Sequence, residues 1–148
     1  MTKKEKIMKR TVLAIFVVYI IFLLRLAVFR DDFLEYRLFE HGTLNFVPLA
    51  NYLKLLKAHA YRFAFYQFVG NIGWFVPFGF LLPFFTGKPE KLGLMLVYGF
   101  LLSLMIELSQ LAFGTGVTEF DDLILNTFGA AVGFWLFGLC RRLAERKK

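Results

Sequence analysis

Residues 92–113, LGLMLVYGFLLSLMIELSQLAF, decide the fold of this chain. The stretch contains a single charged residue, Glu107. An α-helix needs about 20 mostly apolar residues to cross the hydrocarbon core of a bilayer, and this stretch satisfies that requirement. It therefore predicts a transmembrane helix.

Three further apolar runs flank this one, at residues 11–29, 68–85 and 123–139. Hydrophobic residues make up 58% of the 148-residue chain and the mean hydropathy is +0.60, whereas soluble domains are about 45–50% apolar. The excess of apolar residues is expected to face lipid. The sequence thus predicts an all-α integral membrane protein with four transmembrane helices, forming one domain over residues 1–148.

Basic residues predict the orientation of these helices. Residues 1–10 and 141–148 carry five Lys or Arg each, and the turn at 87–91 adds Lys88 and Lys91. The connections on the other side carry fewer, all of them in residues 30–67. Because cytoplasmic loops are enriched in Lys and Arg, both termini are expected in the cytoplasm.

The long connection at residues 30–67 would then be extracytoplasmic. After Pro48, apolar residues recur at helical spacing at Leu49, Leu53 and Leu56, a period typical of an amphipathic helix. We expect this segment to form an interfacial helix.

Several functional classes lack support in the sequence. The net charge of +7 comes mainly from the two ends of the chain, not from a basic face interleaved with aromatic residues, so nucleic-acid binding is not expected. Cys140 is the only cysteine, and His41 and His59 lack the H-E-x-x-H spacing of zinc hydrolases. No metal site is assigned from these residues.

Polar residues within the apolar runs are the candidates for function, because such residues are costly in lipid and tend to be functional or paired. Under the predicted topology they gather near the outer ends of the helices, facing the loop that contains Asn45. We predict one ligand-binding cluster formed by polar residues of these runs, the aspartates that border the fourth run and the asparagine of the loop: Asn45, Asn71, Glu107, Gln110, Asp121, Asp122 and Asn126.

Three interpretations of the carboxylates Glu107, Asp121 and Asp122 remain open. In the structural one, Arg25 neutralises a buried acid and the aspartates cap the last helix. In the second, several oxygens hold Mg²⁺ or Ca²⁺, which binds a lipid phosphate. In the third, the three acids are catalytic residues, with Glu107 as the general acid or base in hydrolysis of a lipid-linked substrate.

Four motifs in order carry a family resemblance. They are NFVPL at 45–49, NIGWFVPFGFLLP at 71–83, SLMIELSQ at 103–110 and DDLILNTFG at 121–129. Together they resemble the VanZ-like family of bacterial membrane proteins. Members often carry a basic residue shortly before the Asp-Asp pair, whereas residues 116–119 of this chain contain none.

The resemblance implies a multi-pass protein of the bacterial plasma membrane, from a family named for a member associated with resistance to the glycopeptide teicoplanin. The expected partners are membrane lipids and a glycopeptide or lipid-linked cell-wall precursor. No cofactor is implied. The alternative function is an intramembrane hydrolase or transferase that uses Glu107 with Asp121 and Asp122.

Overall fold

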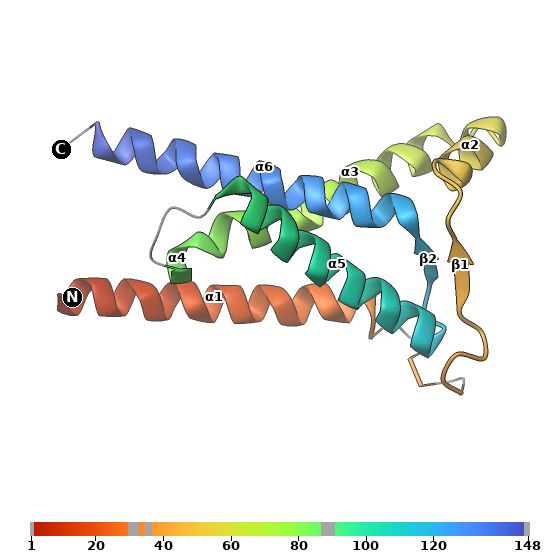
Figure 1. Cartoon of the computed structure of the whole chain (residues 1–148), viewed down its shortest axis with the longest axis horizontal. Helices are drawn as coiled ribbons and strands as arrows, with labels where there is room; N and C mark the ends of the chain where they lie inside the picture. The colour runs from red at the N-terminus through yellow and green to blue at the C-terminus, as the bar shows by residue number, and fades with distance from the viewer. Residues whose placement is uncertain (1, 30–32, 35–36, 87–90, 147–148) are drawn as a thin grey trace.

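The structure is a bundle of long helices with both termini at the same end (Figure 1). The computed structural model describes residues 2–29, 33–34, 37–86 and 91–146. In these ranges, four helical segments are long and apolar enough to cross a membrane. The chain is therefore a multi-pass membrane protein, as the sequence predicted.

The helices extend beyond the apolar runs at several ends. They are α1 (Lys3–Ala27), α3 (Tyr61–Leu81) followed by the short α4 (Pro83–Thr86), α5 (Leu92–Phe113) and α6 (Phe120–Glu145). Lys, Arg, Gln and Glu favour helices about as well as Leu does, so polar flanks continue a helix past its apolar part. The basic turn predicted at 87–91 lies outside the described residues except for Lys91, and so does Arg30.

The start of α1 shows why its basic segment is helical. Thr2 caps the helix by accepting a hydrogen bond from the Glu5 amide, and the Glu5 carboxylate accepts one from the Thr2 amide. This reciprocal pair satisfies backbone donors that the first turn leaves without partners. The helix can therefore begin well before the apolar run at residue 11.

At the opposite end, two short strands and a small helix form a cap on the bundle. Strand β1 (Thr43–Asn45) pairs in parallel with β2 (Val117–Glu119), which places Asn45 opposite Glu119. Helix α2 (Ala50–Lys57) follows β1, where the sequence predicted a helix. The strand pair was not predicted, because three residues are too few for an alternating pattern to be recognised.

Glycines bring α3 and α6 into close contact. A Cβ on Gly79 would lie 1.8 Å from the Ala130 carbonyl oxygen, and one on Gly129 would lie 2.1 Å from that of Ile72. Gly133 approaches the Val76 carbonyl in the same way. Small residues allow such backbone contact between membrane helices, so the Gly129 and Gly133 spacing serves packing within this chain.

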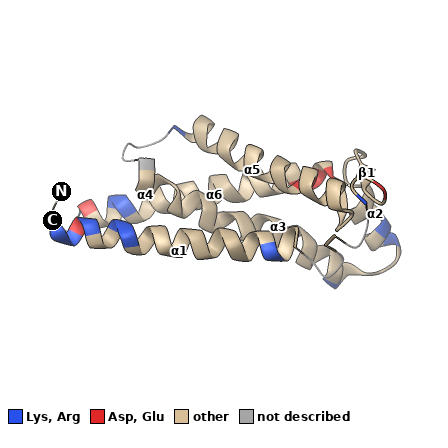
Figure 2. Cartoon of the chain, turned by 90° about the horizontal axis from the view of Figure 1, so that it is seen from below, with Lys and Arg blue, Asp and Glu red and all other residues tan. Residues whose placement is uncertain are grey.

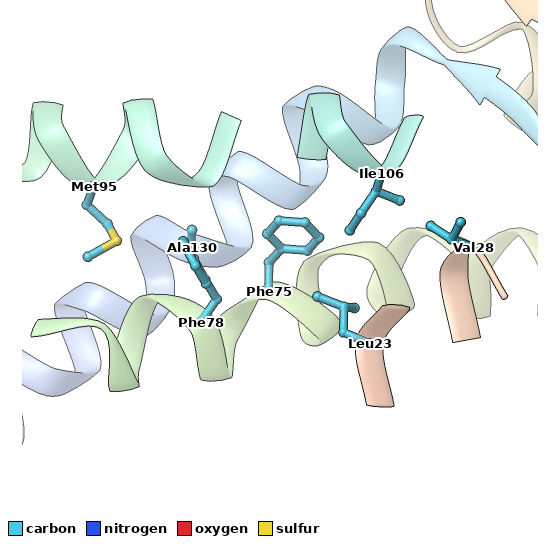
Figure 3. Close-up of a cluster of buried hydrophobic side chains, with 7 residues drawn as sticks. All are labelled: Leu23, Val28, Phe75, Phe78, Met95, Ile106 and Ala130. Carbon is cyan, nitrogen blue, oxygen red and sulfur yellow. The ribbon is translucent and has the colours of Figure 1, made fainter. Parts of the chain in front are cut away.

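The apolar core lies along the middle of the bundle and receives side chains from α1, α3, α5 and α6 (Figure 3). Phe75 of α3 and Met95 of α5 are almost fully buried in it. Leu23 and Val28 bring the end of α1 into the same cluster. This core holds the helices together, and the polar residues lie at the end of the bundle opposite the termini.

Candidate functional site

The polar residues predicted to form a site lie at the end of the bundle opposite the termini. Figure 2 shows acidic residues there, beside the end of α5 and near β1 and α2. Glu107 comes from α5, Asn71 from α3, and Asp121 and Asp122 from the first turn of α6. Acidic side chains in a first turn interact favourably with the helix dipole.

Glu107 connects α5 to β2. Its side chain is 1% exposed, and its Oε2 accepts a hydrogen bond from the Glu119 amide at 3.0 Å. The Glu107 carbonyl accepts a second bond from the Thr118 hydroxyl at 2.9 Å. A buried carboxylate needs such donors, because an unpaired one would be strongly destabilising. Glu107 therefore holds β2 against the end of α5.

Asp121 connects α6 to the loop before α2. Its Oδ2 accepts a hydrogen bond at 2.7 Å from the amide of Leu49, 72 residues away in the chain. Leu49 precedes α2 and has a left-handed backbone with φ 58°, which is uncommon for a residue other than glycine. The carboxylate thus supports a strained turn that orients α2.

Asp122 takes part in a second set of contacts. Its Oδ1 accepts a hydrogen bond from the Asn71 amide group on α3, and Asn71 is also hydrogen-bonded to the Tyr52 hydroxyl on α2. Burial and, to a smaller extent, the charges of Asp122, Glu119 and Asp121 together raise the pKa of Tyr52 to about 12. Tyr52 therefore stays protonated beside these carboxylates at neutral pH.

Asn126 lies one helical turn below Asp122. Its side-chain amide donates to the Ser103 hydroxyl at 2.9 Å, and that hydroxyl lies 3.5 Å from the Asp122 carbonyl oxygen. Both side chains are buried. Hydrogen bonds of this kind join neighbouring helices within a membrane, and this one joins α5 to α6.

Asn45 and Gln110 occupy different positions relative to the rest. Asn45 lies on β1 and is hydrogen-bonded to the Glu119 side chain. Gln110 instead donates to the Ala27 carbonyl at 3.0 Å and so links α5 to the end of α1. Asn45 therefore lies beside a carboxylate of the site, whereas the side-chain hydrogen bond of Gln110 goes to α1.

Glu119 and Tyr52 are members of the cluster that the sequence did not identify. Burial raises the pKa of the Glu119 carboxyl, and the charge of Asp121 raises it further, whereas hydrogen bonds from Asn51 and Asn45 and the charge of Lys54 oppose the rise. Glu119 directly precedes the apolar run of α6, so its position beside the two aspartates was the available signal. We refer to Tyr52, Asn71, Glu107, Glu119, Asp121 and Asp122 as the polar cluster.

The oxygens considered for Mg²⁺ or Ca²⁺ accept hydrogen bonds from within the protein. The side chains of Asp121 and Glu107 accept hydrogen bonds from backbone amides, and that of Asp122 accepts one from the Asn71 side-chain amide. Over the described ranges, no three His, Cys, Asp or Glu side chains are arranged to hold a metal ion. These contacts hold the fold together, but they are not those of the structural interpretation: α6 begins without a side-chain cap hydrogen bond, and Arg25 donates to the Phe29 carbonyl.

Comparison with known proteins assigns the chain to a family. The model of the VanZ/LLP1 family matches residues 11–141, a range that contains the four apolar runs of the sequence and the whole polar cluster. The chain belongs to the VanZ/LLP1 family. This confirms the resemblance found in the sequence motifs.

A relative supports the same assignment over almost the whole chain. Protein VanZ of Enterococcus faecium is 29% identical over 145 residues, which cover 97% of this chain and 81% of that protein. No solved structure matches the chain. The polar cluster lies inside the range matched by the VanZ/LLP1 family. It joins α2, α3, α5 and the start of α6, which lie far apart in the sequence.

Proposed function

We propose that this chain is a non-enzymatic protein of the bacterial plasma membrane that modulates susceptibility to teicoplanin. In this proposal, the end that carries the polar cluster faces the outside and binds the polar part of an envelope lipid or a lipid-linked cell-wall precursor. Family membership supports the link to glycopeptides. The polar cluster beneath the cap of β1, β2 and α2 carries the proposal, because it gathers carboxyl and amide groups of distant segments at one end of the bundle.

The orientation rests on the distribution of charge. Both termini lie at the same end of the bundle, and residues 1–10 and 141–148 hold five basic residues each. The positive-inside rule assigns this end to the cytoplasm.

Native Cys140 allows this orientation to be tested, since it is exposed near the end of α6. A membrane-impermeant thiol reagent should label Cys140 only after cells are permeabilised. In a Cys140→Ser background, Leu44→Cys on exposed β1 should be labelled in intact cells. Labelling of Cys140 in intact cells would contradict the orientation.

Exposed apolar residues beside the polar cluster favour contact with lipid. Phe46, Val47 and Leu49 are 66%, 64% and 53% exposed in the turn that leads into α2, and Leu53 continues this surface. Lys54 and Lys57 flank it. A surface with apolar residues bordered by basic ones is typical of segments that lie at the membrane interface, which brings headgroups to the polar cluster.

The test of this function compares drug susceptibility in matched strains. Deletion should change teicoplanin susceptibility, and the wild-type gene should restore it. Asn71→Ala should restore it less well, because it removes the donor to Asp122. Gln110→Ala, whose hydrogen bond goes to α1, should behave like wild type at equal membrane abundance. Unchanged susceptibility after both deletion and overexpression would refute the proposal.

The proximity of the carboxylates favours a second candidate, a hydrolase or transferase that acts on a lipid-linked substrate. Glu107 has Asp122 and Glu119 as electrostatic neighbours, and paired carboxylates can divide acid and base roles. Glu107→Gln keeps an acceptor for the Glu119 amide but removes the titrating group. It should abolish a lipid product at normal expression, and identical lipid profiles in deletion and wild-type cells would exclude this candidate.

A further inference from the structure

A groove of about 710 Å³ lies at the other end of the molecule, along the C-terminal half of α6. Its lining is mostly apolar and includes Phe128, Val132 and Trp135 of α6 and Leu92 at the start of α5. In Figure 1, this half of α6 runs on toward the C-terminus beyond the point where α5 begins. The groove is remote from the polar cluster, so its role is separate from the function proposed above.

Five of the lining residues follow one face of the helix. Phe128, Val132, Trp135, Leu139 and Arg142 line the groove, and their spacing of three or four residues places them on the same side of α6. With a rise of 1.5 Å per residue, the face from Phe128 to Arg142 is about 21 Å long. This exceeds half of the roughly 30 Å hydrocarbon core, so the groove can hold acyl chains from one leaflet.

Gly138 keeps the groove open. A Cβ at Gly138 would have no atom within 4 Å, whereas at Gly129 and Gly133 of the same helix it would meet the backbone of α3. Close helix packing therefore explains the first two glycines of α6 but not Gly138. The absent side chain at Gly138 instead leaves space in the lining of the groove.

The mouth of the groove carries a net positive charge. Arg141, Arg142 and Glu145 line it, and Arg141 forms an ion pair with Glu145 at 2.9 Å. The charge of Arg142 is thus the net charge at the mouth. An arginine guanidinium can bind a phosphate through two parallel hydrogen bonds, and basic pockets beside membrane helices bind anionic headgroups.

We propose that this groove binds an anionic glycerophospholipid, with its acyl chains against Phe128 and Trp135 and its phosphate on Arg142. The long apolar face selects a lipid over a soluble phosphate. The single net charge at the mouth selects an anionic headgroup over a zwitterionic one. Trp135, 65% exposed, supplies a large apolar surface to the chains.

Native mass spectrometry of the purified full-length protein in detergent tests the proposal. Phosphatidylglycerol and phosphatidylcholine with the same acyl chains are added separately, and glycerol phosphate is added as the free headgroup. We expect phosphatidylglycerol to bind about tenfold more tightly than phosphatidylcholine, as a charge-assisted hydrogen bond allows. Glycerol phosphate should not bind. Equal affinity for the two lipids, or binding of glycerol phosphate alone, would overturn the proposal.

Two substitutions locate the site. Arg142→Gln should reduce the affinity for phosphatidylglycerol to that for phosphatidylcholine, and Gly138→Leu should weaken binding of both lipids. Gly73→Leu is the matched control, because Gly73 is a helical glycine whose Cβ would also meet no atom within 4 Å, and it does not line the groove. Equal effects of the two leucine substitutions would place the lipid elsewhere.

A second copy of the chain is the competing occupant. If the lipid-free protein is a dimer that Gly138→Leu converts to a monomer, the groove is a subunit interface and the lipid proposal is wrong. A monomeric mass for both proteins, together with the loss of lipid affinity in Gly138→Leu, supports the proposal.

Discussion

The two halves of α6 differ in what they contact, although both contain glycine and polar residues. In the first half, Asp121, Asn126, Gly129, Ala130 and Gly133 are buried. From residue 134 to residue 145, every residue is at least partly exposed. The first half packs against α3 and α5, whereas the second half, together with Phe128 and Val132, lines the groove. The role of a glycine or polar residue in a membrane helix therefore depends on which atoms lie opposite it.

The largest effect should come from filling a packed glycine of the first half. Gly129→Val places a side chain against the Ile72 carbonyl, and neither backbone can move without separating α3 from α6. Overpacking typically costs about 1–3 kcal/mol, and we expect the loss of stability here to lie near the upper end of that range. The free energy of unfolding in mixed micelles measures it. Gly138→Val in the second half is the control, and an equal loss there would remove the contrast between the halves.

The next effect should come from Asp121, at the start of the same half. Asp121→Ala leaves the Leu49 amide without its acceptor, and an unsatisfied part-buried donor costs about 1–3 kcal/mol. Helix α2 should loosen, which faster amide exchange at Leu49 and faster proteolysis of 46–57 would show. Asp121→Asn keeps a carbonyl acceptor and should show a smaller change. Unchanged exchange at Leu49 in the alanine variant would contradict this role.

A smaller effect should appear in the pH dependence of stability. Burial and Asp121 raise the pKa of Glu119, so the folded protein holds this proton more tightly than the unfolded chain does. The stability contributed by Glu119 is complete below its unfolded pKa and is lost as pH rises through its folded pKa. Thermal unfolding of wild type and Glu119→Gln should be measured from below the unfolded pKa of Glu119 to above its folded pKa. The melting temperature should fall less with rising pH in the variant than in wild type. Parallel profiles would contradict the prediction.

The smallest effect should have the opposite sign and arise in the second half. Gly138→Ala adds a methyl group in open space and replaces glycine by the best helix former. We expect a gain of about 0.5–1 kcal/mol, measured as above. Gly133→Ala, which meets the Val76 carbonyl, should instead destabilise the protein. A loss in both variants would show that the position of Gly138 is also packed.

The sequence predicted the membrane spans well but their ends less well. The span at 92–113 coincides with α5 because Lys91 precedes it and Gly114 ends it with a left-handed backbone, φ 65°, as glycine commonly does after a helix. Helix α3 begins at Tyr61, before the apolar run at 68, since Arg62 and Gln67 are compatible with a helix. Hydropathy detects the part in lipid and not the helical continuation into the interface.

The polar cluster was predicted in part for a related reason. Intramembrane Asn71, Glu107 and Asn126 were noticeable because polar residues are rare in apolar runs. Glu119 and Tyr52 were missed because they lie outside the runs, where a polar residue is ordinary. Gln110 was grouped with Glu107 by helical spacing, yet it donates to the Ala27 carbonyl on α1. Spacing within one helix does not determine which neighbouring helix a side chain meets.

By itself, the sequence determined that this is a multi-pass membrane protein of the VanZ/LLP1 family, because the length of an apolar run and the order of short motifs are local properties. Only the tertiary structure decided that Asp121 holds Leu49, that Glu107 holds β2, and that Gly138 leaves a groove where Gly129 closes a contact. Those facts depend on which distant segments come within a few ångströms, and helix packing, not helix formation, sets those distances.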